Sequence, residues 1–352
     1  MRRPREMTNT SQCQEPPSKN STPSVSIVIV AYKRRDYLLR AMKSAIGQIG
    51  TKGPYEVVVV KNLKDEEIDE YIRQNGIRSI EMPSGPVGEY IARGIQASSA
   101  DVVCLLDDDD AFLPEKVTQV QRAFSLDHKL CYYHSAHEIR YDDDTVVRSV
   151  LHRPALISTS VSGESSDYRT LKRIIANNLV LNLSCVSVRR SVFLNWIEAI
   201  RGMQGATDFM MFYVALATKG NLLFDRAIQS IYYIHRNSAS RPVDHSMSSI
   251  DPVQRWAHEQ MYTYTFGVSL PESIGILEAA SALKSQWEWI YLLMSSVNRR
   301  EIVPSYGKFV SSSLLLRPGF VVLSIPIGLV SLASPTFGRR LFHLLRTVNL
   351  NL

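Results

Sequence analysis

Short, unbroken apolar runs alternate with segments of helical periodicity in the first third of the chain. The apolar runs are rich in β-branched residues, as in strands that are buried on both faces. They cover residues 25–31, 56–60, 77–82 and 102–106. Segments with apolar residues at helical spacing separate them, over residues 36–48, 65–74 and 88–98. This alternation predicts a doubly wound, mostly parallel, Rossmann-like α/β sheet.

The regular alternation ends near residue 115. Further helices are expected at residues 115–124, 191–200 and 207–219, and further strands at 130–141, 145–151, 184–188, 221–224 and 228–235. From 251 to 298 the chain is helical and rich in Trp and Tyr. The expected organisation is a disordered N-terminal tail (1–23), an α/β domain (24–245) and a C-terminal helical region (246–352).

An uncharged, strongly apolar segment covers residues 318–338. Its length is about that of a bilayer core, but Pro318, Pro326 and Pro335 interrupt it and basic residues flank both sides. We therefore expect a re-entrant or interfacial segment rather than a clean span. Residues 337–348 then form a basic amphipathic helix. The alternative is a pair of buried core helices.

Composition narrows the class of protein. Apolar residues make up 45% and charged residues 21% of the 352 positions, which excludes a disordered or fibrous chain. The net charge of +6 is too small to indicate a nucleic-acid partner by itself, and it suits an anionic small ligand or an anionic membrane surface. The four cysteines lack a CxxC spacing, which fits a reducing compartment. The polar residues 1–23 do not resemble a signal peptide.

Four adjacent carboxylates, Asp107 to Asp110, follow the fourth apolar run. Such a cluster at a buried strand end is costly without a cation. Strand-like alternation points Asp107 and Asp109 the same way, so that they could hold Mg²⁺ or Mn²⁺ and leave positions for diphosphate oxygens. The alternative is a solvated acidic loop. Asp142 to Asp144 form a second acidic run, which a hairpin turn explains.

Several motifs in this order resemble the inverting nucleotide-sugar glycosyltransferases of family 2, which have the GT-A fold. Residues 26–34 are similar to the family's opening S-I-V-I-P-T-Y-N-R, and residues 88–94 to its G-x-x-x-A-R-N segment. Leu39, Ala41, Ser44 and Gln48 match its L-x-x-A-x-x-S-x-x-x-Q run, and 106–110 resembles its D-x-D segment. Residues 207–209 and 235–240 resemble its T-D and H-x-x-S-x-S segments. The resemblance covers residues 24–240.

The resemblance implies a role for each matching position. Asp208 is the expected catalytic base. The expected metal-binding residues are Asp109, Asp107 and His235. The expected nucleotide-sugar-binding residues are Ala31, Tyr32, Arg34, Asn62, Arg93, Asp107 and Asp108. One departure concerns the second strand, which usually ends in a base-binding Asp. Lys61 stands there instead and cannot accept a hydrogen bond, although the next residue, Asn62, can.

The expected function is therefore inverting, metal-dependent glycosyl transfer in glycan or glycoconjugate synthesis. The expected donor is a nucleotide-diphosphate sugar. The expected acceptor is a hydroxyl or phosphate group of a glycan or a polyprenyl-linked compound. The expected location is the cytoplasmic face of the cell membrane, where the C-terminal segment is peripheral, re-entrant or single-pass. A non-catalytic nucleotide-sugar-binding protein of the same fold is one alternative. A nucleotidyltransferase is another, although residues 31–34 lack the glycines that its phosphate loop needs. The sequence also allows a homo-oligomer.

Overall fold

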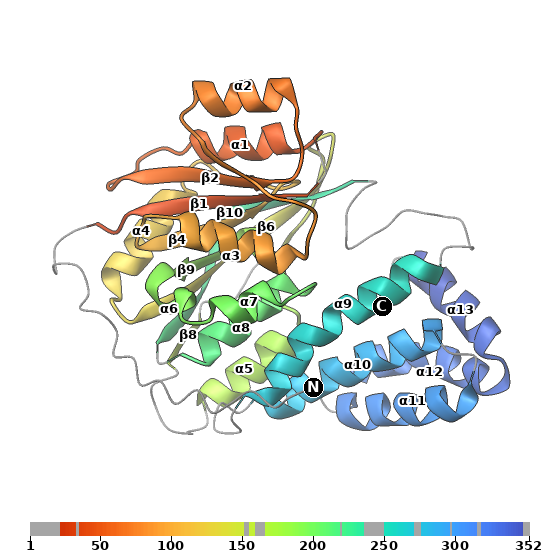
Figure 1. Ribbon diagram of the computed structural model, residues 1–352. Coiled ribbons are helices and arrows are strands. Elements are labelled where there is room, and N and C mark those ends of the chain that lie inside the picture. Colours follow the sequence, from red (N-terminus) through yellow and green to blue (C-terminus); the bar gives the residue numbers. More distant parts are fainter. Residues whose placement is uncertain are drawn as a thin grey trace.

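A computed structural model describes residues 22–32, 35–150, 155–158, 166–218, 220–235, 250–270, 276–295, 298–314 and 318–347. The predicted tail therefore lies almost wholly outside the described residues, as does Arg34. The first half follows the predicted alternation of strands and helices (Figure 1). Its strands are β1 (Val25–Ala31), β2 (Tyr55–Lys61), β3 (Arg78–Glu81) and β4 (Val102–Asp107). The helices between them are α1 (Leu38–Ile46), α2 (Glu66–Gln74) and α3 (Val87–Ala97).

The second half adds strands to the far edge of the same sheet. These strands are β5 (Ala111–Phe112), β6 (Leu130–Tyr141), β7 (Val146–Val150), β8 (Ala155–Ser158), β9 (Val186–Arg189) and β10 (Asn221–Ile234). The helices are α4 (Lys116–Leu126), α5 (Ser166–Ala176), α6 (Arg190–Leu194), α7 (Ile197–Arg201) and α8 (Thr207–Leu216), with a 3₁₀ turn at Leu183–Cys185. The helix predicted for 191–200 is thus two short helices. The two strands predicted within 221–235 are one irregular strand.

The sheet has the order β3-β2-β1-β4-β9-β6-β10-β5. Strands β1 to β4 pair in parallel, β9 runs antiparallel to both β4 and β6, and β10 returns parallel to β6. The long strands other than β9 therefore point their carboxyl ends towards one edge. The predicted fold class, a mostly parallel α/β sheet followed by a helical region, is confirmed. Ligands of such sheets bind at the carboxyl edge.

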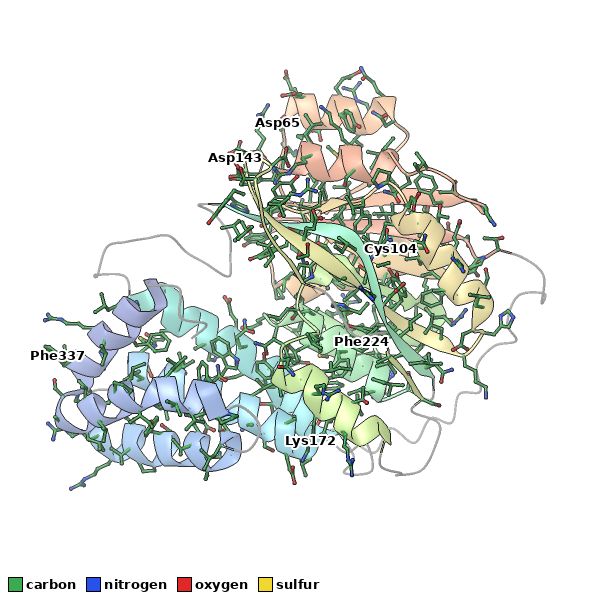
Figure 2. The ribbon with its side chains drawn as sticks, turned by 180° about the vertical axis from the view of Figure 1, so that it is seen from behind. Asp65, Cys104, Asp143, Lys172, Phe224 and Phe337 are labelled. Carbon is green, nitrogen blue, oxygen red and sulfur yellow. The ribbon has the colours of Figure 1, made fainter. Side chains whose placement is uncertain are left out.

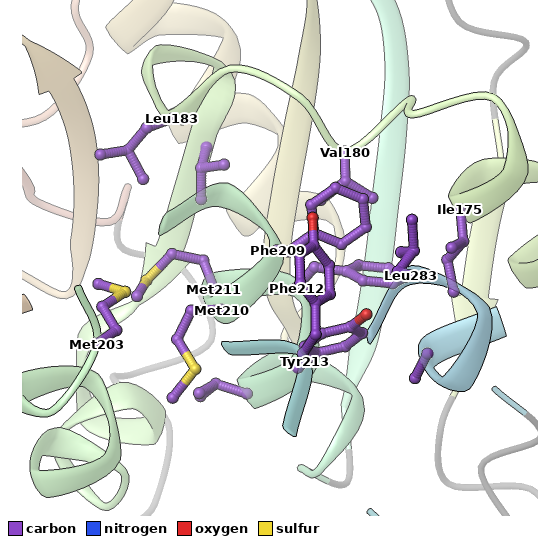
Figure 3. Packing of buried hydrophobic residues seen from close by; sticks show 14 of the residues in the cluster. Ile175, Val180, Leu183, Met203, Phe209, Met210, Met211, Phe212, Tyr213 and Leu283 are labelled. Carbon is purple, nitrogen blue, oxygen red and sulfur yellow. The ribbon is translucent and has the colours of Figure 1, made fainter. Parts of the chain in front are cut away.

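Two hydrophobic layers sandwich the sheet. In β1, Ile27 and Ile29 face the layer that α1, α2 and α4 cover, whereas Val28 and Val30 face the layer of α3 and α8. Helix α8 is buried on all sides, as expected for a helix that is apolar all round. Figure 3 shows its residues packed among Val180, Leu183 and Leu283, the last of which comes from the C-terminal region. The helical region therefore completes the core beneath α8.

The C-terminal helical region packs against one side of the α/β domain (Figure 1). It consists of α9 (Ile250–Ser269), α10 (Leu277–Ser295), α11 (Arg299–Ser313), α12 (Pro318–Ala333) and α13 (Pro335–Thr347). Pro326 was expected to interrupt the apolar segment, but it lies inside α12, on the exposed face of that helix. Among the described residues, none of the helices combines the length and the apolar character that a bilayer crossing requires.

Candidate active site

Three carboxylates lie together where β4 ends at the carboxyl edge of the sheet. Asp107, Asp109 and Asp110 bring carboxylate oxygens within 4.8 Å of one another. Asp109 and Asp110 are buried, and Asp107 is half-buried. The run therefore does not form the solvated loop that was the alternative interpretation. Asp108 is also fully buried, and its Oδ2 accepts a hydrogen bond of 3.1 Å from the backbone N–H of Tyr32. That bond joins the ends of β4 and β1.

Asp110 is held firmly at the base of this cluster. Its Oδ2 accepts a hydrogen bond of 2.6 Å from the Ser184 hydroxyl, and its Oδ1 accepts one of 3.2 Å from the backbone N–H of Tyr233. Burial, together with the neighbouring Asp109 carboxylate, raises the pKa of Asp110 to about 8. A cation placed among these oxygens would reverse that cost.

Asp109 contacts two basic side chains from distant parts of the chain. Its Oδ2 lies 3.0 Å from Nε2 of the buried His235, which follows β10. The Arg40 guanidinium from α1 donates a 3.0 Å hydrogen bond to the Asp109 carbonyl oxygen. The Tyr37 ring lies over the His235 ring with centroids 4.0 Å apart. These contacts fix the position of Asp109, and they place His235, another expected metal-binding residue, beside it.

Asp208 lies in the first turn of α8, where it is half-buried. Its Oδ1 accepts the backbone N–H of Phe209 at 2.9 Å, and its Oδ2 accepts the backbone N–H of Asn182 at 3.2 Å. Burial among apolar side chains outweighs these bonds and raises the pKa of Asp208 to about 6. A carboxylate whose pKa lies near neutrality can both take up and release a proton under physiological conditions.

A short hydrogen-bonded path connects Asp208 with the acidic cluster. The Asn182 backbone N–H bonds to Asp208, and its side-chain oxygen accepts the N–H of Ser184 at 2.9 Å. The Ser184 hydroxyl then donates to Asp110, and it also lies 3.1 Å from the backbone N of Asp107. Both ends of the path thus depend on the turn at Asn182–Ser184.

Two residues next to this path have left-handed backbone conformations. Asn182 has φ 88° and Ala206, which precedes α8, has φ 50°. Such conformations cost about 1–3 kcal/mol outside glycine, and they concentrate at functional sites. Here they turn the chain so that Asn182 and the start of α8 meet at the Asp208 carboxylate.

The loop before Asp208 is supported from two sides. From α3, the Gly88 N–H donates 3.1 Å to the Met203 carbonyl, and a Cβ on Gly88 would lie 2.2 Å from the Ile200 carbonyl oxygen. From α9, the buried Thr263 donates 2.7 Å to the Gly205 carbonyl. Gly88 therefore permits a backbone approach that any other residue would block.

The residues expected at the nucleobase lie at the ends of β1 and β2. Ala31 is fully buried, Tyr32 is exposed, and Asn62 is half-buried beside the Tyr90 hydroxyl. The Tyr32 and Tyr90 rings meet edge to face with centroids 5.7 Å apart. These side chains form one wall at the carboxyl edge.

The Lys61 side chain has a structural role. It is buried, with its Nζ 2.9 Å from an Asp69 oxygen and 2.9 Å from the Leu63 carbonyl oxygen. Lys61 is thus turned towards α2 by its own partners, and Asn62 is the next polar residue after β2.

Arg93 lies on the exposed side of α3, whereas the neighbouring Gly94 packs on Val28 of the sheet. The structure thus brings together Asp107, Asp109, His235 and Asp208, the expected catalytic and metal residues. It adds Asp110, Ser184, Asn182 and Arg40, which were not predicted. Asp110 could have been found within the acidic run. Ser184 and Asn182 form a turn that carries no motif, so the sequence holds no signal for them.

The donor set at the cluster fits a divalent cation that prefers oxygen. Three carboxylates with oxygens inside 4.8 Å suit Mg²⁺ or Mn²⁺. Asp109 and Asp110 are buried next to each other, and a cation at this point would offset the repulsion that raises the pKa of Asp110. Asp107, Asp109 and Asp110 are the residues that would hold the ion.

The mostly parallel sheet and the acidic residues that follow its fourth strand are features of GT-A-type glycosyltransferases. Residues 26–194 match the protein-family model "Glycosyl transferase family 2". The match assigns residues 26–194, which are somewhat less than half of the chain, to this family of glycosyltransferases. The predicted GT-A fold and the recognition of the family are thereby confirmed.

One curated relative is the succinoglycan biosynthesis protein ExoO of Rhizobium meliloti. It is 24% identical over 241 residues, which cover 64% of this chain and 65% of ExoO. The chain therefore matches somewhat less than two-thirds of that relative's length.

Solved structures share the fold. The fragment 1–349 of TarS from S. aureus, in complex with UDP-GlcNAc, has a TM-score of 0.56 at 13% identity, with 90% of this chain and 89% of the fragment covered. The mannosyltransferase PcManGT from Pyrobaculum calidifontis, in complex with GDP-Man and Mn²⁺, has a TM-score of 0.50 at 11% identity. Its alignment covers 94% of this chain and 89% of PcManGT. At these identities the likeness concerns the fold alone.

Proposed function

We propose that this chain transfers a sugar from a nucleoside diphosphate sugar to an acceptor hydroxyl, with inversion at the anomeric carbon. The observation that carries the proposal is the hydrogen-bonded path from Asp208 through Asn182 and Ser184 to Asp110. It holds an acidic cluster suited to a metal diphosphate and a carboxylate of raised pKa in one rigid unit.

The residues divide the chemistry between them. Asp208 takes the proton from the acceptor hydroxyl, whose oxygen forms the new bond to C1 of the sugar. The bond between C1 and the diphosphate oxygen breaks on the opposite face, and the electron pair leaves with the diphosphate. General-base assistance of this kind contributes about 10²–10⁴-fold to the rate. A Mg²⁺ or Mn²⁺ ion at the cluster supplies positive charge for the diphosphate.

The donor side of the site suits a base with an imide edge. The Asn62 amide offers one acceptor and one donor, and the uracil and guanine rings each present an N–H next to a carbonyl. TarS was solved with UDP-GlcNAc, and PcManGT with GDP-Man. UDP- and GDP-sugars are therefore the two donor classes to test. Ala31 and Tyr32 would border the base, and Asp107, with Asp108 behind it, would face the ribose or the sugar.

The acceptor is proposed to be a growing glycan or a polyprenyl-linked compound. The role of Asp208 distinguishes a hydroxyl acceptor from a phosphate acceptor. A hydroxyl acceptor needs a base, whereas an anionic phosphate acceptor attacks without one. Asp208→Asn should therefore lower the rate of transfer to a hydroxyl by about 10²–10⁴-fold, but it should spare transfer to a polyprenyl phosphate.

The first test is thermal stabilisation by UDP and GDP, with and without Mn²⁺. A ligand at 100 times its Kd adds about 2.7 kcal/mol to the stability. We expect stabilisation by one nucleotide series that depends on Mn²⁺ and is lost in Asp109→Asn. Asp143→Asn, in the exposed acidic turn between β6 and β7, is the matched control and should respond like the parent protein.

Two outcomes would contradict the proposal. The first is equal stabilisation with and without Mn²⁺, both in Asp109→Asn and in the parent protein. This result would contradict metal binding at the carboxylate cluster. Nucleotide binding without any transfer or donor hydrolysis would favour the non-catalytic binding protein. The anomeric configuration of the product, read by NMR, then decides between inversion and retention.

A further inference from the structure

Helix α12 is apolar on its outward side as well as on the side that packs on the protein, unlike a typical surface helix in water. The side turned towards the protein buries three large apolar residues and three small ones, which are Phe320, Val321, Ile327, Ser324, Gly328 and Ser331. The side turned outwards carries large apolar residues, with Val322 61% and Leu329 60% exposed. A surface helix normally buries its large apolar face and exposes its polar face. The outer medium that suits α12 is therefore apolar.

The inward face of α12 is closely packed, so its orientation is fixed. A Cβ on Gly328 would lie 2.3 Å from the Tyr306 ring of α11. The Tyr306 hydroxyl lies 3.3 Å from that of Ser324, and the Ser331 hydroxyl donates 2.6 Å to the Ile327 carbonyl within its own helix. Small residues at helix contacts and hydroxyls bonded to their own helix are typical of helices in lipid.

The exposed residues of α12 are apolar and uncharged. The sequence from residue 318 to 338 contains no charged residue. The face continues from α12 onto the next helix through Phe337, which is 60% exposed and lies at the outer edge of the helical region (Figure 2). The large exposed apolar residues of this face are Val322, Leu323, Ile325, Leu329, Leu332 and Phe337. We call them the outer face. An exposed apolar patch of this kind marks an interaction surface.

The charge around the outer face identifies the partner. Residues 299–352 contain seven Lys or Arg and one Glu, so they carry the whole net charge of +6 of the chain. Arg340, which follows Phe337 by three positions in the sequence, is exposed. An apolar face bordered by cations matches the boundary between acyl chains and anionic headgroups. Binding to a purely apolar protein surface would gain nothing from this positive charge.

We propose that the outer face docks in the plane of an anionic lipid surface, with α12 lying in the interface and Arg340 among the headgroups. Docking of this type leaves the α/β domain in water. The lipid contact itself is independent of the proposed function. The further consequence, that an acceptor is presented at that surface, rests on the proposed function.

The test is flotation of the full chain with phosphatidylcholine vesicles that contain 0 or 30 mol% phosphatidylglycerol. We expect binding to the anionic vesicles that weakens as salt is raised. Leu329→Glu should weaken it about tenfold or more, because burial of one leucine in acyl chains contributes that much. Arg340→Gln should weaken it about fivefold, on anionic vesicles alone.

Matched variants separate this proposal from its alternatives. Leu126→Glu, at the end of α4, changes a leucine that is 77% exposed and should leave flotation unchanged. Val322→Asn is a second outer-face variant in case Leu329→Glu does not fold. Asp109→Asn should float like the parent, so failure of the catalytic proposal would not affect the result.

Two results would overturn the proposal. The first is flotation that is absent, or equal in Leu329→Glu and Leu126→Glu. The second is a parent protein that forms dimers without binding vesicles and becomes monomeric in Leu329→Glu. That result would assign the outer face to a second copy of the chain.

Discussion

Thr263 of α9 donates a hydrogen bond of 2.7 Å to the carbonyl oxygen of Gly205, three residues before Asp208. The same helix brings Gln260 against Gly205, where a Cβ would lie 2.6 Å from the Gln260 side-chain nitrogen. The C-terminal region therefore contacts the loop that presents the proposed base. This contact makes α9 part of the site's support, although α9 carries no residue of the acidic cluster.

Thr263→Val removes the hydroxyl at nearly constant shape and leaves the Gly205 carbonyl without this partner. We expect a loss of about 1 kcal/mol of stability and a fall in kcat of about fivefold, with the KM for the donor unchanged. Steady-state kinetics at varied donor concentration test this. Ser269→Ala is the control, since that exposed hydroxyl bonds only within α9, to the Phe266 carbonyl. A parallel rise in donor KM would argue against a role confined to the base.

Gly88→Ala should lower both stability and kcat. The added Cβ would lie 2.2 Å from the Ile200 carbonyl oxygen and 2.7 Å from that of Met203, so α3 and the segment before Asp208 must move apart. Overpacking of this kind costs about 1–3 kcal/mol. In Gly307→Ala, a Cβ meets nothing within 4 Å, and helix propensity alone should raise stability by up to about 1 kcal/mol. Thermal unfolding of the pair gives the comparison, and similar effects in both would contradict the packing argument.

The rate should depend on pH through Asp208. Since its pKa is raised to about 6, the base is ionised above pH 6 and becomes protonated below it. We expect kcat/KM with a hydroxyl acceptor to fall on the acid side of about pH 6. Asp208→Asn should lower kcat/KM by about 10²–10⁴-fold and remove this limb. An unchanged acid limb in the variant would assign the titration to another group.

The same carboxylate should make stability depend on pH. Its pKa of about 6 in the folded chain exceeds the ordinary 3.8, so the folded state binds this proton more tightly than the unfolded state does. Its contribution to stability is therefore complete below about pH 4 and is lost as pH rises through 6. Asp208→Asn should be more stable than the parent at pH 7 by at most about 3 kcal/mol, and the gap should close at pH 4. Urea unfolding at the two pH values measures it.

Asn62 should govern recognition of the base. Asn62→Ala removes both the donor and the acceptor and should weaken UDP or GDP binding by about tenfold, the value of one or two hydrogen bonds. Asn62→Asp keeps an acceptor, as in the usual family pattern, and should retain most of the affinity. Calorimetric titration of each nucleotide with the variants tests the assignment. Equal affinity in all three proteins would place base recognition elsewhere.

The parts of the fold that rest on local pattern were predictable. Buried β-branched runs such as those at Val28 and Val58 admit few structures other than central parallel strands, and the order of strands and helices followed from them. The acidic run was also visible, because four carboxylates behind a buried strand need an explanation. The helix at Ser166–Ala176 and the short strands β5 and β8 were not predicted, since their stability comes from tertiary packing rather than from their own pattern.

The candidate site shows the same division. Asp109 and Asp208 carry motifs, whereas Ser184 and Asn182 are ordinary residues whose importance lies in what they touch. The partnership of Asp109 with His235 spans 126 positions, and no periodicity in the sequence encodes such a distance. The predicted break at Pro326 failed for a physical reason as well: its ring lies on the open side of α12, away from the packed face.

The turn at Leu183–Cys185 has a consequence for mutational maps of this protein. Because Ser184 contacts the cluster while the preceding Asn182 contacts Asp208, a change in this turn disturbs both ends of the site at once. Variants there should score as inactive in a genetic screen as strongly as variants of the carboxylates themselves. A mutational tolerance profile should therefore show two sensitive positions here, Asn182 and Ser184, in a segment that need not touch a substrate.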